Sequence, residues 1–323
     1  MIHVKCDSTD AAFNFALEKY LMQCPEMPDD YFLFWRTTPT LMIGRFQNTL
    51  AEINMPYAKE RGIKIVRRIT GGGTIYTDLN GWQFSFIVKR EGRMDFAGFT
   101  RPILDALRSL GVDAQLSGRN DLTIDGRKFS GNAEFIGKGV TLHHGSLLFD
   151  TDLEELVRSL NVSDEKIISK GIKSVRQRVT NISEHLKEKM TSVEFRDVML
   201  DFLLRGMGTY ELSRKDIESV EDIKRSQFDS WEWNFGNDPK FNVTKENRFA
   251  GGKLCAKVLV ENGRIANIRF YGDFFADERI GALEQSLTGC RYDEENIKEA
   301  LLNSNAADCF YNITAGEILS CII

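Results

Sequence analysis

The feature that most constrains the fold is a run of short strand-like segments between residues 119 and 149. Glycine turns interrupt this run at Gly126, Gly131, Gly137 and Gly139. Strands joined by short turns pair with their neighbours in the chain, whereas parallel strands need long crossovers, which are usually helical. The pattern therefore argues against a doubly wound nucleotide-binding fold. It predicts an α+β protein with a mixed or antiparallel sheet and flanking helices.

The rest of the chain alternates between helical and strand periodicity. Ser8-Thr9-Asp10 precedes apolar residues at helical spacing, which predicts a helix over 8–23. Further helices are expected near 95–110, 151–160, 181–189, 191–205 and 292–302, and further strands near 31–35, 40–43, 63–67, 74–76 and 83–88.

Length and proline placement predict two domains. A chain of 323 residues exceeds what one hydrophobic core usually organises. After Pro102 the only proline is Pro239, inside a polar stretch. We expect a larger domain over 1–237, a linker over 238–245 and a small α+β domain over 246–323. In the last of these, Glu261-Asn262-Gly263 predicts a hairpin between strands at 254–260 and 264–270.

Composition excludes several classes of protein. An apolar fraction of 42% is ample for a packed core and excludes a disordered chain. A net charge of −5 provides no global basic field for nucleic acid. The six cysteines form no CxxC pair, which favours reduced thiols in a cytoplasm. The N-terminus lacks an apolar signal segment and no apolar run could span a bilayer, so we expect no membrane association.

The most unusual motif is Gly71-Gly72-Gly73, directly after Arg67-Arg68 and before Thr74-Ile75-Tyr76. Three consecutive glycines cost backbone entropy. They form either a flexible loop or a backbone that approaches a ligand, with amide groups turned toward an anion. The adjacent arginines support an anion site, and both interpretations stay open.

A second motif surrounds Lys128. Asp125-Gly126 is typical of a hairpin turn, in which Lys128 would be an ordinary solvated lysine. However, its neighbours Ser130 and Gly131 are small and leave room for a ligand carboxylate or phosphate beside the amine.

Two further segments are polar. His143 and His144 are adjacent and should point to opposite faces of a strand, so we interpret them as hydrogen-bonded histidines and assign no metal ligands. Residues 170–178 hold four cations and no acid, as either a solvated loop or a mobile lid over an anionic ligand. No GxSxG motif occurs, and no cysteine lies near these motifs, which disfavours nucleophilic catalysis.

Several ordered motifs together resemble the lipoate–protein ligase family, across nearly all of residues 8–236. The matching segments are 43–48, 67–78, Gly118-Arg119-Asn120-Asp121-Leu122, Arg127-Lys128-Phe129-Ser130-Gly131, His143-His144-Gly145 with Leu147-Leu148, 170–176, Arg178-Val179-Thr180-Asn181 and 231–236. The resemblance implies a catalytic domain of the biotinyl/lipoyl-transferase type. The last eighty residues look like the family's accessory domain, with weaker support.

The resemblance also implies a two-step reaction. Lipoate attacks the α-phosphate of ATP, which gives lipoyl-AMP, and a lysine of an acceptor protein then takes the lipoyl group. Lys128 would bridge the lipoate carboxyl and the α-phosphate, and Arg68 would contact the nucleotide. The implied binding residues are Arg68, Gly71, Gly72, Gly73, Thr74, Ile75, Tyr76, Asn120, Asp121, Lys128, His144 and Gly145.

ATP would enter with Mg²⁺, held largely by its phosphates, and lipoic acid is the second substrate. The implied partners are lipoyl-accepting domains of a 2-oxoacid dehydrogenase E2 or a glycine-cleavage H protein. We expect a cytoplasmic monomer.

This chain departs from the family pattern at two places. Thr77-Asp78-Leu79-Asn80-Gly81 stands where the family usually has His-Asp-Leu-Gly-Asn, and Ser146 replaces a usual threonine. The first departure leaves open a weakly catalytic regulator that binds lipoyl domains. The nearest rival enzyme is an ATP-independent octanoyl transferase, which uses a cysteine near its site, and biotin–protein ligases rank lower.

Overall fold

The computed structural model describes residues 1–24, 27, 29–160, 177–235, 242–261 and 263–323. Most of the basic segment 170–178 lies outside the described residues, as do Pro239 and residues 238–241 of the expected linker. Asn262 of the expected hairpin turn also lies outside them.

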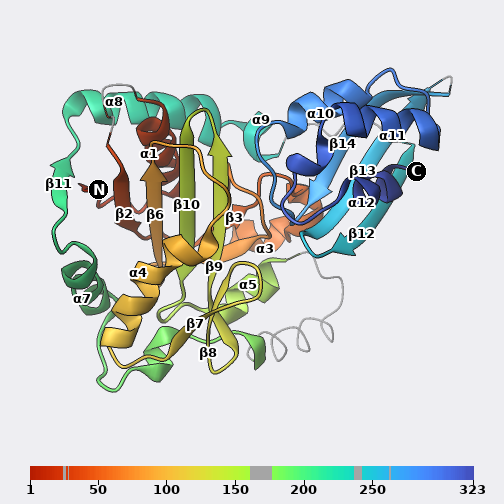
Figure 1. The fold of residues 1–323 in the computed structure, drawn as a ribbon. Helices are drawn as coiled ribbons and strands as arrows, with labels where there is room; N and C mark the ends of the chain where they lie inside the picture. The colour runs from red at the N-terminus through yellow and green to blue at the C-terminus, as the bar shows by residue number, and fades with distance from the viewer. Residues whose placement is uncertain (25–26, 28, 161–176, 236–241, 262) are drawn as a thin grey trace.

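Within the described residues, the largest sheet has eight strands in the order β11-β1-β2-β6-β10-β9-β8-β7 (Figure 1). β1 runs parallel to both of its neighbours, and the other pairs are antiparallel. The prediction of a mixed sheet in an α+β fold is confirmed. The strands are β1 (Ile2–Lys5), β2 (Tyr31–Trp35), β6 (Trp82–Val88), β7 (Ala114–Ser117), β8 (Asp121–Ile124), β9 (Arg127–Gly137), β10 (Val140–Leu147) and β11 (Gly208–Glu211).

Two three-stranded sheets complete the described strands. The order β4-β3-β5 joins Lys64–Arg67, Thr40–Ile43 and Ile75–Thr77, with β4 parallel and β5 antiparallel to β3. The order β12-β13-β14 is antiparallel and comprises Val243–Phe249, Gly252–Glu261 and Arg264–Gly272. This last sheet, blue in Figure 1, lies to one side of the main sheet.

Helices cover the sheets. The longest helix among the described residues is α4 (Phe96–Ser109), which begins after the cap Asp95 and ends before Gly111, whose φ is +80°. The other α-helices of the described residues are α1 (Ala11–Gln23), α2 (Thr49–Glu52), α3 (Met55–Glu60), α5 (Leu153–Ser159), α7 (Ser192–Leu203), α8 (Arg214–Ile223), α9 (Trp231–Asn234), α10 (Ile280–Leu287), α11 (Glu294–Asn303) and α12 (Ala315–Ile322). The 3-10 turns are η1 (Ile182–His185) and η3 (Ala306–Asp308), and η2 (Lys224–Phe228) is a π-helical turn.

Apolar cores lie on both faces of the main sheet and beneath the C-terminal sheet. Helix α1 is buried along most of its length because it lies against β6 and β10 on one side and α8 on the other. The C-terminal core also takes in Phe46, whose ring stacks on Phe274 at 4.7 Å between centroids. Residues on both sides of the expected linker therefore pack against one another.

The expected helix over 181–189 is wrong, since only the short turn η1 forms there. The Asn181 side chain does not cap it. Instead, its amide bonds the backbone N–H and C=O of Thr151, at 3.1 Å each. An uncapped segment has little support for a longer helix. Sequence patterns also missed β11, which pairs with β1 across more than 200 residues.

Candidate active site

A pocket of about 130 Å³ lies where β9 and β10 face the loop between β4 and β5. The residues that line it are Phe15, Trp35, Met42, Arg68, Gly72, Gly73, Thr74, Ile75, Gln83, Asn120, Lys128, Gly131, Asn132, Ala133, His144, Gly145, Ser146 and Phe275.

The glycine loop is shaped by two close approaches. Gly72 has φ +93°, a backbone conformation that L side chains rarely adopt, and a Cβ there would lie 2.9 Å from an Arg68 nitrogen. A Cβ on Gly71 would lie 2.2 Å from the carbonyl oxygen of Phe274. Gly72 N–H donates to that same carbonyl at 3.2 Å. The loop thus fits between Arg68 and the segment that follows β14.

Arg68 is buried and holds the loop together. Its guanidinium donates to the carbonyls of Met42 (2.9 Å), Gly71 (2.8 Å) and Gly73 (2.8 Å) and to the Thr70 hydroxyl (3.1 Å). Burial, with a smaller contribution from neighbouring Arg67, lowers the pKa of Arg68 to about 9. The side chain therefore keeps its positive charge at neutral pH beside the pocket.

Lys128 reaches the pocket from a β-bulge. The β8–β9 register pairs Leu122 with Ser130 but Thr123 with Lys128, which leaves Phe129 as the extra residue. The Lys128 ammonium ion-pairs with Asp121 Oδ1 at 2.7 Å, and its side chain is 38% exposed. A Cβ on Gly131 would lie 3.0 Å from the Lys128 Nζ, so the small residue provides space for the amine.

His143 and His144 point to opposite faces of β10, and each binds a buried glutamate, which confirms the interpretation as hydrogen-bonded histidines. On the pocket side, His144 Nδ1 lies 3.0 Å from Glu18 Oε1, and Nε2 lies 2.7 Å from the Thr70 hydroxyl. Because Thr70 also accepts from Arg68, this chain of hydrogen bonds connects α1 to the glycine loop.

Gly145 is required by packing. A Cβ at this position would lie 2.2 Å from Asn132 Oδ1 and 2.5 Å from the Phe84 ring. Asn132 is the cross-strand partner of Gly145, so its side chain occupies the space that the glycine leaves.

Three of the expected site residues do not line the pocket. Gly71 contacts Phe274, and Asp121 contacts the site only indirectly, through its ion pair with Lys128. Tyr76 is buried in a separate apolar cluster with Leu41 and Ile43, and burial raises the pKa of its hydroxyl. The other nine expected residues all line the pocket.

The unusual Thr77–Gly81 segment forms a tight turn. The Asp78 carboxylate accepts the Asn80 N–H at 2.9 Å, and Gly81 N–H donates to the Asp78 carbonyl at 3.2 Å. The Thr77 hydroxyl accepts from the Gln83 amide at 2.6 Å. Thr77 thus orients a side chain that lines the pocket.

Sequence reasoning missed several lining residues, Gln83 and Phe275 among them. Gln83 is polar in a fully buried strand, and that is a signal which could have identified it. Its Oε1 is buried and has no hydrogen-bond partner among the described residues. Phe275 lies far along the chain, and no local pattern connects it to the pocket. The guanidinium carbon of Arg119 lies over the Phe275 ring, 4.6 Å from the ring centroid.

Other searches of the described residues give the following. No cluster of three or more His, Cys, Asp or Glu side chains suited to a metal ion occurs among them. No helix in these parts of the chain has the length and apolar character to cross a membrane. All six cysteines lie in described parts, and none lines this pocket.

Two family models identify the class of protein as a ligase. Residues 10–204 match the family model described as the lipoyl protein ligase A/B catalytic domain. Residues 238–322 match the model of the bacterial lipoate protein ligase C-terminus.

Relatives match over the full length. Lipoate-protein ligase LplJ of Bacillus subtilis is 41% identical, with 97% of each chain covered. Lipoate–protein ligase 1 of Staphylococcus aureus is 38% identical, with 96% of each covered. The chain therefore belongs to the lipoate–protein ligase family, and its function is lipoate activation and transfer.

Solved structures share the fold. LipL1 of P. falciparum, solved in complex with lipoate, superposes with a TM-score of 0.79 at 21% identity, covering 93% of each chain. A bipartite lipoate protein ligase of Thermoplasma acidophilum, studied with its E2 lipoyl domain, gives a TM-score of 0.66 at 27% identity. It covers 75% of this chain and 98% of its own.

Proposed function

We propose that Lys128 and the glycine loop catalyse the adenylation of lipoate by ATP in this pocket. A lipoate carboxylate oxygen attacks the α-phosphorus, the bond to the β-phosphate bridging oxygen breaks, and pyrophosphate leaves. Both reactants are anionic, so a cation between them lowers the repulsion. The observation that carries this assignment is the partly exposed side chain of Lys128, which lines the same pocket as Gly72, Gly73 and Thr74.

The second step transfers the acyl group. A deprotonated lysine ε-amine of the acceptor attacks the carbonyl carbon of lipoyl-AMP, the bond to the phosphate oxygen breaks, and AMP leaves while the amine proton passes to solvent. The mixed anhydride is already activated, so this step needs proximity and no enzyme nucleophile. Mg²⁺ accompanies ATP as part of that substrate.

We further propose the acceptors and setting. The acceptor is a lipoyl domain of a dehydrogenase E2 or a glycine-cleavage H protein, a proposal supported by the E2 lipoyl domain studied with the Thermoplasma relative. The protein acts as a monomer in the cytoplasm, which suits its six free thiols.

The domain assignment is also a proposal. Residues 1–237 would form the catalytic domain, 238–245 the linker and 246–323 the accessory domain. Two observations support it: the separate apolar core beneath β12–β14, and a family match that begins at residue 238.

The test measures both steps. Purified protein is incubated with ATP, Mg²⁺ and either lipoate or octanoate, and pyrophosphate release is followed. Candidate acceptor domains are then added and their intact mass is measured. We expect pyrophosphate release that depends on the acid, followed by one acyl addition to the acceptor. Acyl transfer from a carrier protein without pyrophosphate release would instead support the octanoyl transferase.

A further inference from the structure

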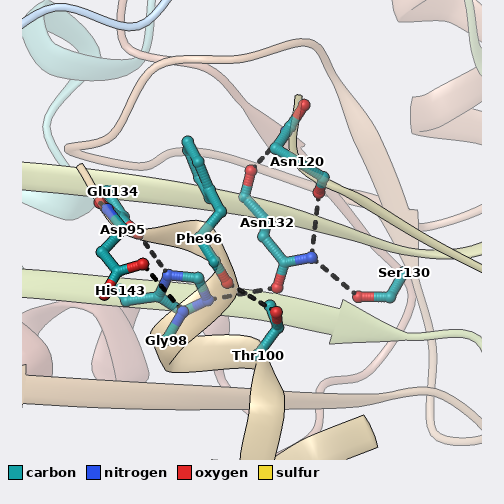
Figure 2. Close-up of polar contacts among 9 residues, drawn as sticks. All are labelled: Asp95, Phe96, Gly98, Thr100, Asn120, Ser130, Asn132, Glu134 and His143. Atoms are coloured by element: carbon teal, nitrogen blue, oxygen red, sulfur yellow. Dashed lines mark hydrogen bonds and ion pairs between the residues drawn. The ribbon is translucent and has the colours of Figure 1, made fainter. Parts of the chain in front are cut away.

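Figure 2 shows a second buried histidine–carboxylate pair, His143 with Glu134. Because His143 and His144 are adjacent on β10, this pair lies on the opposite face of the strand from His144. His143 and Glu134 are directly opposite each other on β10 and β9, and both side chains are fully buried. Nδ1 of His143 lies 2.9 Å from Glu134 Oε1, and Glu134 Oε2 accepts the Asp95 N–H at 3.0 Å. Phenylalanine rings enclose the imidazole, including Phe99 at 5.0 Å between centroids.

The other ring nitrogen of His143 faces an amide whose orientation is fixed. The Asn120 carbonyl lies 3.0 Å from Asn132 Nδ2 and 3.0 Å from the Asn132 backbone nitrogen. A carbonyl only accepts hydrogen bonds, so the amide nitrogen of Asn132 must face it. The remaining atom, Asn132 Oδ1, then faces His143 Nε2 at 3.3 Å (Figure 2).

These contacts determine how many protons the pair holds. An amide oxygen accepts only, so Nε2 must carry a proton in order to bond Asn132. Nδ1 and Glu134 must share a second proton. The pair is therefore an imidazolium with a carboxylate, or a neutral ring with a protonated carboxyl. In the neutral tautomer with hydrogen on Nδ1 alone, a lone pair of His143 Nε2 would face a lone pair of Asn132 Oδ1.

Burial lowers the pKa of the His143 imidazole, an effect that Glu134 opposes, and Asp95 and His144 are the other titratable groups that act on the ring. Both distributions keep the proton on Nε2.

The network continues to the pocket. Asn120 Nδ2 returns a hydrogen bond to the Asn132 carbonyl at 2.5 Å, so the two asparagines hold each other. The next residue, Asp121, ion-pairs with Lys128 at 2.7 Å. Contacts therefore connect the buried pair to the amine proposed to act in adenylation.

We propose that His143, with Nε2 protonated, is a positioning residue for adenylate formation: it fixes Asn132 and Asn120 and thereby holds Asp121 and Lys128 at the pocket. This inference rests on the proposed role of Lys128. In this role His143 acts through Asn132 and Asn120 and does not need to contact a substrate.

The first experiment reads the proton directly. Nitrogen-15 NMR of histidine-labelled wild-type protein at neutral pH should show a protonated Nε2 for His143. The signal is assigned by replacing the other three histidines with glutamine in turn. A bare Nε2 on His143 would overturn the proposal, whatever the enzyme's activity.

The second experiment uses two substitutions at one position. The oxygen of Glu134→Gln can still accept the Asp95 N–H, and its amide nitrogen can donate to Nδ1, which keeps the proton on Nε2. We expect kcat for pyrophosphate release within about twofold of wild type. Glu134→Ala leaves Nδ1 without a partner, so kcat should fall about 10- to 100-fold, the scale of a misplaced reacting group. The KM values for ATP and lipoate should change by less than about threefold.

Controls separate the possible failures. Circular dichroism and thermal unfolding establish that both variants fold. A folded Glu134→Ala protein with wild-type kcat would refute the positioning role alone, as would equal losses in the glutamine and alanine variants. If Glu134→Ala does not fold, the glutamine variant and the NMR measurement still decide. Absence of pyrophosphate release by wild-type protein would contradict the proposed function and leave the NMR test of the pair intact.

Discussion

Lys128 and Arg68 are two cations that line the same pocket in opposite ways. The Arg68 guanidinium is buried and donates four hydrogen bonds to the glycine loop and to the neighbouring strand β3. The Lys128 side chain is partly exposed, and its amine forms an ion pair with Asp121. Arginine's planar fork can hold several carbonyls at once, whereas lysine is a mobile point charge. The comparison indicates that one cation builds the site and the other is free to meet a substrate.

Lys128→Ala should show the largest effect on activity. We expect adenylate formation to fall by about three orders of magnitude or more, because no other group replaces the charge between two anions. The melting temperature should stay within about 2 °C of wild type, because an exposed ion pair contributes less than about 1 kcal/mol. Pyrophosphate release and differential scanning fluorimetry measure the two effects.

The matched control is Lys5→Ala, which removes an exposed lysine paired with Glu211 at 2.9 Å. It should change neither quantity. Wild-type turnover in the Lys128 variant would mean that the site assignment fails.

Arg68→Lys should lower both activity and stability. A lysine cannot reach the carbonyls of Met42, Gly71 and Gly73 together, and a buried acceptor without a partner costs about 1–3 kcal/mol. We expect unfolding free energy to fall by about 2–5 kcal/mol and kcat by about 100-fold. Urea unfolding and single-turnover kinetics test this. A fully stable, inactive variant would instead indicate that Arg68 acts on the nucleotide and that the loop does not need it.

Gly72→Ala should have an intermediate effect. The positive φ and the 2.9 Å approach to Arg68 together cost about 1–3 kcal/mol, and kcat should fall about tenfold as the loop shifts. Gly73→Ala is the control, since its Cβ would meet only Asp273 Cβ, at 4.0 Å. Equal sensitivity at both positions would show that loop flexibility, and not the left-handed backbone of Gly72, is what matters.

Asp121→Asn should give the smallest change. It keeps the shape of the side chain but removes the charge that restrains Lys128. We expect kcat to fall about threefold to tenfold while the KM for lipoate decreases, because the freed amine binds the carboxylate more readily. Initial rates across lipoate concentrations separate the two parameters, and an increased KM would contradict this reading of the ion pair.

The sequence predicted those parts of the site that are local in the chain. The glycine loop, Lys128 and His144 each lie within a short motif, and the structure brings them to one pocket. Glu18 and Phe275 could not be predicted in this way, because His144 and Arg119, which they contact, lie more than a hundred residues away in the chain. The sequence pattern also failed where a side chain had two possible sets of partners. Asn181 has the residue type of a helix cap, but its side chain forms hydrogen bonds with the Thr151 backbone.

The bulge at Phe129 fixes the register of the β8–β9 hairpin, that is, which side chains of each strand face the pocket. Because successive residues of a strand face opposite sides, inserting or deleting one residue between Asp121 and Lys128 would exchange the faces of the two strands' side chains while leaving many backbone bonds possible. A change of two residues would restore the alternation. As this chain diverges, length changes in the hairpin should therefore be tolerated in pairs, and a single-residue change should separate the lysine from its pocket.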